Sequence, residues 1–239
     1  MANYPNVYEL SDGTTVAVPI RYSKGRLLSA VFLADLGGAS KLLEGTGLHA
    51  VPQEDGKAMA FIQTYEYQMT DLDPYNEFLL GILAISPKDP EPGIWVTDLP
   101  VTQDHTNRGG REIWGFPKIV TTIDIDMPQD GKKFNIKVHT PEDGELCSVT
   151  GHRGDSILAP PADACTLTIL DGTVLRARVQ IVHPAHLSTG ENVVVKAGKS
   201  EHKLSENLRT LGLDGASPML VAYSPVFQSM LHGGTEVQV

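Results

Sequence analysis

Residues 110–120 read Gly-Arg-Glu-Ile-Trp-Gly-Phe-Pro-Lys-Ile-Val, and they lead one lysine, Lys118, out of a bulky apolar run and into a predicted strand. Pro117 fixes its own φ and favours an extended conformation for the residue before it. Residues 118–127 place apolar or threonine side chains at every second position, which is the spacing of a β-strand. Because side chains alternate along a strand, Lys118 shares a face with Phe116 and Val120.

The surroundings of Lys118 bear on its chemistry, since they are aromatic and branched apolar groups. Burial among such groups disfavours the ammonium form of a lysine. A neutral amine is the form that attacks a carbonyl carbon to give a Schiff base. The residues alone leave open a simpler interpretation, in which Lys118 begins a strand and extends its ammonium group into water.

The rest of the chain also favours β-structure. Asp171-Gly172 separates two alternating runs between residues 164 and 182, which predicts a tight hairpin. A proline-rich loop is expected over residues 87–93, a turn at Asp130-Gly131 and a loose glycine-rich end of the chain. Further strands are expected over residues 15–20, 26–33, 57–69, 77–86, 94–101, 134–139, 144–149, 192–196 and 219–223.

Few helices are predicted. The best helix runs from Glu201 to Leu211, with Ser200 as its cap, an apolar face of leucines and Gly212 after its end. A short helix is expected over residues 39–44, and a helix or loop over residues 103–110. Many strands and few helices, without regular βαβ alternation, predict one largely antiparallel β or α+β domain over residues 1–239.

Composition restricts the classes of function. The 239 residues are 41% hydrophobic and 20% charged, which is ordinary for a globular protein. A net charge of −10 argues against a nucleic-acid partner, because the surface that binds nucleic acid is basic. No apolar run reaches the roughly 20 residues that span a membrane, and the N-terminus lacks the pattern of a secretion signal. We therefore expect a cytoplasmic protein without a membrane partner.

Metal and phosphate sites have little support. Cys147 and Cys165 have no paired spacing, which predicts neither a disulfide scaffold nor a zinc site and fits a reducing compartment. His183 and His186 lack a carboxylate or cysteine at ligand spacing, so they are a weak metal signal. The chain has no phosphate-binding glycine loop and no Gly-x-Ser-x-Gly elbow. No metal ion is expected.

The segment around Lys118 resembles the active site of a known family. Gly110-Arg111-Glu112, a short apolar stretch and then aromatic-Pro-Lys are similar to the active-site segment of the acetoacetate decarboxylase family. The family's lysine forms a Schiff base, so the resemblance implies this role for Lys118. The family has a second lysine where this chain has Ile119, and a tyrosine where this chain has Phe116. Arg111 and Glu112 are expected to form a structural pair that holds the turn.

Glu77 is the second candidate for chemistry. It begins an apolar segment that predicts a strand buried on both faces, where a carboxylate is either an acid or base or a solvated strand end. The family has a Tyr-x-Glu motif with the glutamate in the active site. Tyr75-x-Glu77 matches this motif, so the resemblance implies a catalytic role for Glu77.

The resemblance also implies residues that bind the substrate. The family places an arginine at the head of its second strand to pair with a substrate carboxylate, which a guanidinium binds with two hydrogen bonds. Arg26 is the expected counterpart, and Arg21 is the alternative. A second family glutamate falls closest to Gln63, with Glu66 nearby. The expected substrate-binding residues are Arg26, Gln63, Tyr75, Trp114 and Phe116.

The resemblance covers most of the chain loosely, and it implies a barrel-like β fold with a few packed helices. It also implies a lyase that works through a covalent imine on Lys118 without a separate cofactor. Because the second lysine and the tyrosine hydroxyl are missing and Gln63 replaces a glutamate, acetoacetate is disfavoured as the substrate. We expect an aldolase–dehydratase that joins a 2-keto acid such as pyruvate to an aldehyde.

Two alternatives stay open. The first is decarboxylation of acetoacetate or another β-keto acid, and the second is a non-catalytic protein that binds a small molecule on the same scaffold. The expected partners are small-molecule keto acid and carbonyl substrates, together with further copies of the chain in a homo-oligomer.

Overall fold

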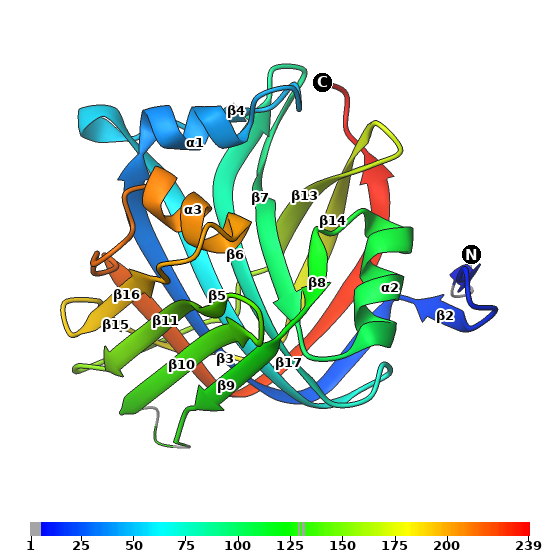
Figure 1. Cartoon of the computed structure of the whole chain (residues 1–239). Coiled ribbons are helices and arrows are strands. Elements are labelled where there is room, and N and C mark those ends of the chain that lie inside the picture. The colour runs from blue at the N-terminus through cyan, green and yellow to red at the C-terminus, as the bar shows by residue number, and fades with distance from the viewer. Residues whose placement is uncertain (1–5, 129, 131) are drawn as a thin grey trace.

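The computed structural model describes residues 6–128, 130 and 132–239, and a strongly curved β-sheet dominates it (Figure 1). The strands β17, β14, β13, β7, β6, β5 and β3 are joined in that order, and β17 also pairs with β3, so they form a closed ring. Most of these pairs are antiparallel. The strands of this sheet are β3 (Ile20–Asp35), β4 (His49–Ala50), β5 (Lys57–Thr70), β6 (Tyr75–Ser86), β7 (Asp89–Val101), β8 (Lys118–Val120), β12 (Ile157–Ala159), β13 (Ala164–Leu170), β14 (Thr173–Ile181), β15 (Ala185–Thr189) and β17 (Leu220–Glu236).

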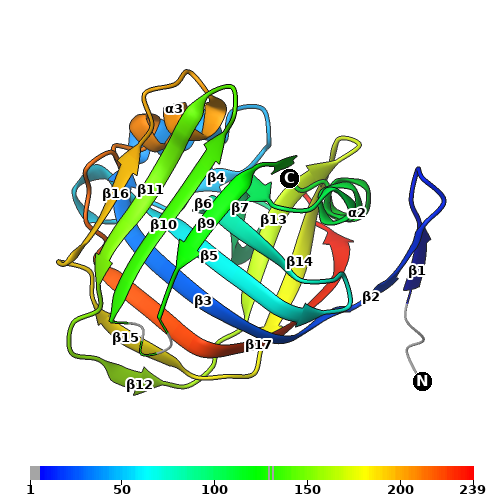
Figure 2. The same ribbon diagram turned by 60° about the horizontal axis from the view of Figure 1, so that its bottom comes forward.

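Smaller elements cover this ring. A four-stranded antiparallel sheet has the order β16-β11-β10-β9, and β1 pairs with β2 in a separate hairpin (Figure 2). The bounds of these strands are β1 (Asn6–Glu9), β2 (Thr15–Val18), β9 (Thr122–Asp126), β10 (Lys133–Thr140), β11 (Gly144–His152) and β16 (Val193–Ala197). The helices are α1 (Leu36–Leu42), α2 (Asp104–Trp114), α3 (Lys203–Thr210) and the 3-10 turn η1 (Glu54–Gly56). Mostly antiparallel strands with a few helices confirm the expected fold class.

The two faces of the central strands belong to different hydrophobic cores. On β6, Leu80 and Ile82 join the core shared with the small sheet, α1 and α3, whereas Leu79 joins the core beneath α2. Figure 1 shows α2 on the opposite side of the molecule from α1 and α3. Burial on both faces explains why this strand is apolar at almost every position rather than at every second one.

The predicted strand over residues 118–127 is two strands. β8 pairs with β7 in the large sheet, whereas β9 pairs with β10 in the small sheet. Thr121 lies between them and donates its backbone N–H to the carbonyl of Val101 at 2.9 Å. The chain therefore changes sheets here, a step that alternation of side chains does not reveal. Gly131 of the predicted Asp130-Gly131 turn lies outside the described residues.

Two expected loops are strands instead. β7 starts at Asp89, so the prediction of a proline-rich loop over residues 87–93 is wrong from residue 89 onward. A shift of register beside Ser86 accommodates the prolines. The glycine-rich end of the chain is not loose, because β17 continues to Glu236 and lies between β3 and β14. Glycine content predicted flexibility here, but hydrogen bonds order the segment, to β3 as far as Leu231 and to β14 as far as Glu236.

The helix boundaries also differ in detail. His202 Nδ1, not Ser200, caps α3 by accepting a hydrogen bond from the backbone of Leu204 at 3.1 Å. α1 starts at Leu36, before the expected start at residue 39, and contains Gly37 and Gly38. Gly38 is needed inside the helix because a Cβ there would lie 2.0 Å from the carbonyl oxygen of Thr210 on α3.

Other predictions are confirmed. The buried Leu204 and Leu208 form the apolar face of α3, and the buried Leu211 caps its end. Asp171 and Gly172 have φ values of 50° and 80°, as the tight turn between β13 and β14 requires. Among the helices of the described ranges, none has the length and apolar character that crossing a bilayer requires.

Candidate active site

Lys118 reaches its place through a sharp turn after α2. The helix ends at Gly115, whose φ of 68° is in the left-handed region that favours glycine. A Cβ at Gly115 would also lie 2.1 Å from the carbonyl oxygen of Ile169, so only glycine fits. Phe116 and Pro117 then lead into β8, where Lys118 pairs with Leu99 of β7.

The Gly-Arg-Glu segment of α2 holds the lysine in place. The Lys118 side chain lies against Gly110, where a Cβ would come within 2.6 Å of its Cδ and Cε atoms. Arg111 donates from Nη1 to the backbone carbonyl of Lys118 at 3.0 Å. Glu112 instead accepts hydrogen bonds from the backbone N–H and the hydroxyl of Ser11, at 2.8 and 2.6 Å. Both residues have structural contacts, but not as the pair with each other that the sequence predicted.

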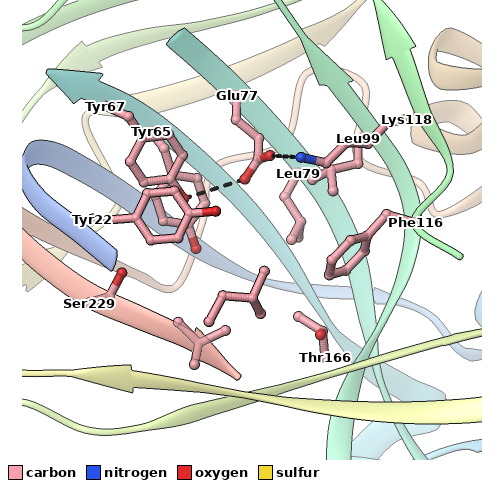
Figure 3. A pocket seen from close by; sticks show the side chains of 12 residues that line it. Tyr22, Tyr65, Tyr67, Glu77, Leu79, Leu99, Phe116, Lys118, Thr166 and Ser229 are labelled. Atoms are coloured by element: carbon pink, nitrogen blue, oxygen red, sulfur yellow. Dashed lines mark hydrogen bonds and ion pairs between the residues drawn. The ribbon is translucent and has the colours of Figure 1, made fainter. Parts of the chain in front are cut away.

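Lys118 and Glu77 meet in the interior. Nζ of Lys118 lies 2.8 Å from Oε2 of Glu77, and the two side chains are only 6% and 9% exposed (Figure 3). The other oxygen of Glu77 accepts a hydrogen bond from the Tyr67 hydroxyl at 3.4 Å. The burial expected for Lys118 is present, whereas its pairing with Glu77 depends on contacts between separate strands.

A small cavity of about 40 Å³ adjoins this pair. Apolar side chains make up much of its wall, and hydroxyl groups most of the remainder (Figure 3). This size favours a ligand with few heavy atoms. The lining residues are Tyr22, Tyr65, Tyr67, Glu77, Leu79, Leu99, Phe116, Lys118, Thr166, Val179, Ser229 and Leu231.

The tyrosines of the cavity wall are hydrogen-bond donors. Burial raises the pKa of Tyr22, Tyr65 and Tyr67, and the negative charge of Glu77 raises it further. Tyr75 stands directly behind them, its hydroxyl 3.3 Å from that of Tyr22, and its pKa is raised by the same two causes. These hydroxyls therefore keep their protons at neutral pH.

The structure brings some of the predicted substrate-binding residues to Lys118. Nζ lies 5.4 Å from the ring centre of Tyr75 and 5.8 Å from that of Phe116. Gln63 lies one step behind the wall, where its Oε1 accepts a hydrogen bond from the Tyr65 hydroxyl at 2.8 Å. Trp114 packs against Phe116 but is not a lining residue, and its Nε1 donates to the carbonyl of His232 at 2.9 Å.

Arg26 lies on the opposite face of the sheet. It precedes Leu27, which packs in the core beneath α2, so its own side chain points the other way. The guanidinium pairs with Glu66 and donates to the carbonyl of Met127. The alternative, Arg21, pairs with Asp71 at 3.2 Å and is largely exposed. Neighbouring residues of a strand face opposite ways, and the match to the family motif does not show which face Arg26 takes.

Sequence reasoning missed the hydroxyl groups of the cavity. Tyr65 and Tyr67 share a face with Gln63 at every second position of β5, and this alternation could have identified them. Ser229 lies in β17, the segment expected to be loose, so no local pattern marked it. Among the lining residues that the structure describes, Lys118 is the only cation.

The arrangement is suited to amine chemistry. A buried amine beside a carboxylate combines a nucleophile with a group that accepts and returns protons. The apolar walls exclude water, and the hydroxyl groups can orient a polar ligand.

Comparison with known proteins identifies one family. A profile of the family described as acetoacetate decarboxylase (ADC) matches residues 7–169, more than half of the chain. No curated protein sequence matches. Among solved structures, an acetoacetate decarboxylase from Legionella pneumophila has a TM-score of 0.70 at 13% identity, over 92% of this chain and 87% of the other.

Two further solved structures are similar. The enduracididine biosynthesis enzyme MppR complexed with pyruvate has a TM-score of 0.69 at 15% identity, over 98% of each chain. An acetoacetate decarboxylase-like enzyme from Sphingomonas wittichii RW1 has a TM-score of 0.64 at 13% identity, over 93% of this chain and 94% of the other. At these identities the likeness shows the shared fold, which confirms the barrel-like architecture expected from the sequence. Because the family profile matches from β1 into β13, this chain belongs to the acetoacetate decarboxylase family.

Proposed function

We propose that the protein is a lyase that holds its substrate as an imine on Lys118 and uses Glu77 to move protons. The observation that carries this proposal is the separation of 2.8 Å between Lys118 Nζ and Glu77 Oε2 beside a buried cavity. Membership of a family named for a lyase supports the same class of reaction.

Imine formation requires Lys118 as a free amine. At 2.8 Å the carboxylate of Glu77 can take one proton from the ammonium group. The lone pair of Nζ then adds to the carbonyl carbon, the carbonyl oxygen is protonated, and it leaves as water while a C=N bond forms. The protonated imine withdraws electrons from the adjacent carbon.

Glu77 is placed to act again after the imine forms. It removes a proton from the carbon next to the imine, which gives an enamine. The enamine carbon attacks the carbonyl carbon of an aldehyde, and the new oxygen takes the proton from Glu77. Loss of a second proton with that hydroxyl group releases water, and hydrolysis of the imine returns Lys118. One carbonyl donor and one aldehyde thus give one unsaturated carbonyl product and one net water.

The reaction type is therefore aldol addition with dehydration. Pyruvate is the donor expected from the sequence, and MppR, a relative in fold, is described in a complex with the condensation product of pyruvate and imidazole 4-carboxaldehyde. Decarboxylation is the weaker candidate, because Phe116 and Ile119 replace polar groups of the family motif and Arg26 does not line the cavity.

The test is borohydride reduction in the presence of a panel of keto acids, ketones and aldehydes, followed by intact mass and peptide mapping. We expect one adduct, on Lys118, and a condensation product in donor–aldehyde mixtures by chromatography. An adduct on another lysine contradicts the assignment. Brisk release of carbon dioxide from acetoacetate without a condensation product favours the decarboxylase, and inactivity without any adduct favours a binding protein.

A further inference from the structure

Ser229 is a buried polar group without an assigned task. Its side chain lines the cavity on the far side from Lys118 (Figure 3). The residue is 4% exposed, and among the described residues its Oγ has no hydrogen-bond partner. Leaving a buried hydroxyl unpaired costs stability, so such a group in a cavity wall indicates a partner that arrives with the ligand.

The surroundings of Ser229 are rich in hydroxyl groups. Tyr22 is its direct partner across β3 and β17, and the Tyr22 hydroxyl lies 3.3 Å from that of Tyr75. Because burial keeps the phenols protonated, this end of the cavity offers neutral hydrogen-bonding groups.

The charge of the cavity disfavours a ligand that carries a carboxylate. Lys118 is the only cation among the described lining residues, and Glu77 already balances it. A carboxylate bound near Ser229 would add a buried negative charge without a matching cation, which is strongly unfavourable. Arg26 offers no compensation, because it lies on the other face of the sheet in a pair with Glu66.

Building on the imine proposed at Lys118, we propose that the donor is an uncharged carbonyl compound whose second oxygen, a hydroxyl or keto group, binds Ser229. This proposal replaces the 2-keto acid expected from the sequence with small neutral compounds of a few heavy atoms. Ser229 sets specificity, whereas Lys118 and Glu77 carry out the reaction.

Two pairs of matched compounds test the proposal through borohydride trapping. Hydroxyacetone and butanone have the same number of heavy atoms and differ by a hydroxyl in place of a methyl group. Pyruvamide and pyruvate are likewise matched in size and differ in charge. Trapping by a free lysine derivative corrects for the intrinsic reactivity of each compound, and intact mass measures the adduct.

Ser229→Ala should weaken the trapping of hydroxyacetone by about tenfold, the typical effect of one hydrogen bond, and leave that of butanone unchanged. Ser188→Ala is the matched control, because Ser188 is a similarly buried serine whose hydroxyl also lacks a described partner but does not line the cavity. Ser188→Ala should leave the trapping of hydroxyacetone and of butanone unchanged. After correction, wild-type protein should trap pyruvamide at least about tenfold better than pyruvate.

Two results would overturn the proposal. One is an equal decrease in the trapping of hydroxyacetone and of butanone by Ser229→Ala, and the other is better trapping of pyruvate than of pyruvamide by the wild-type protein. If no compound is trapped, the imine fails but the site at Ser229 can still be judged. Saturation-transfer NMR then compares the binding of hydroxyacetone and butanone to wild-type protein and Ser229→Ala. If wild-type protein prefers hydroxyacetone and Ser229→Ala does not, the result supports the site at Ser229. If wild-type protein shows no such preference, the site is rejected.

Discussion

Two neighbouring strands each bury a carboxylate, on opposite faces of the same sheet, and the two groups have different partners. Glu77 of β6 faces the core beneath α2 and pairs with the Lys118 ammonium at 2.8 Å. Asp98 of β7 faces α3 and accepts a hydrogen bond from the Asn207 side chain at 2.7 Å. Among the described lysines and arginines, none forms an ion pair with Asp98.

The partner determines what each carboxylate can do. An amine can exchange a proton with a carboxylate and attack a carbonyl carbon. The side-chain amide of Asn207 donates a hydrogen bond to Asp98 but does neither. Asp98 therefore anchors α3 against β7. It is not among the described residues that line the cavity beside Lys118. Burial alone does not identify a reactive carboxylate; the chemistry of its neighbour does.

The largest expected effect comes from Lys118→Arg. The guanidinium keeps the positive charge beside Glu77 but cannot form an imine. Trapping by borohydride and turnover should both be abolished, as intact mass and a product assay would measure. Circular dichroism should show that the variant is folded, and any adduct that remains on a folded variant would contradict the role of Lys118.

Glu77→Gln should come next in size. The amide keeps the shape of the side chain but cannot take a proton, so turnover should fall by about 10³-fold. The borohydride adduct should still map to Lys118 but should form more slowly, because the lysine has lost the base that frees its amine. Asp98→Asn is the matched control on the other face, and we expect it to keep wild-type turnover. Comparable loss of turnover in both variants would mean that the two carboxylates do not differ in function.

Gly110→Ala should have a smaller effect on turnover, through the position of Lys118. The new methyl group would displace Cδ and Cε of the lysine, and a shift of about 1 Å costs about 10²-fold in rate. Gly109→Ala is the control, since its Cβ would lie at least 3.8 Å from the nearest side chains. The free energy of unfolding of Gly109→Ala should stay within about 1 kcal/mol of the wild-type value, because alanine favours the helix by about that amount. That of Gly110→Ala should be lower, because its methyl group crowds the buried Lys118 side chain.

The smallest expected effect is on the pH dependence of stability. Burial raises the pKa of Asp98, although the hydrogen bond from Asn207 opposes the shift. The folded state therefore binds this proton more tightly than the unfolded state. Stability is full below the unfolded pKa of about 3.9 and falls as pH rises toward the folded value.

Asp98→Asn removes this titration, so the decline of unfolding free energy over that window should be shallower than in wild type. Urea denaturation at a series of pH values measures the difference. A decline of equal slope in the variant would assign the pH dependence to other groups.

Much of the fold followed from local pattern. Alternation located β5, and the apolar run of residues 77–86 located most of β6, because burial demands apolar side chains wherever a face is covered. The Asp171-Gly172 turn followed from backbone preferences that belong to those two residues. The change of sheet after Val120 and the ordered backbone of β17 were not predicted. Both depend on pairing between distant strands, which the pattern of residues within one strand does not indicate.

The candidate site divides in the same way. Neighbours in the chain were enough to predict that Lys118 starts a strand among apolar groups and that Glu77 begins a buried strand. Contacts between distant strands were needed to show that these two side chains meet at 2.8 Å and that Arg26 faces away. The same holds for Ser229, which joins the cavity from a strand more than one hundred residues later. The reason is that the facing of a strand and its partners depend on register, and register is fixed by the whole sheet.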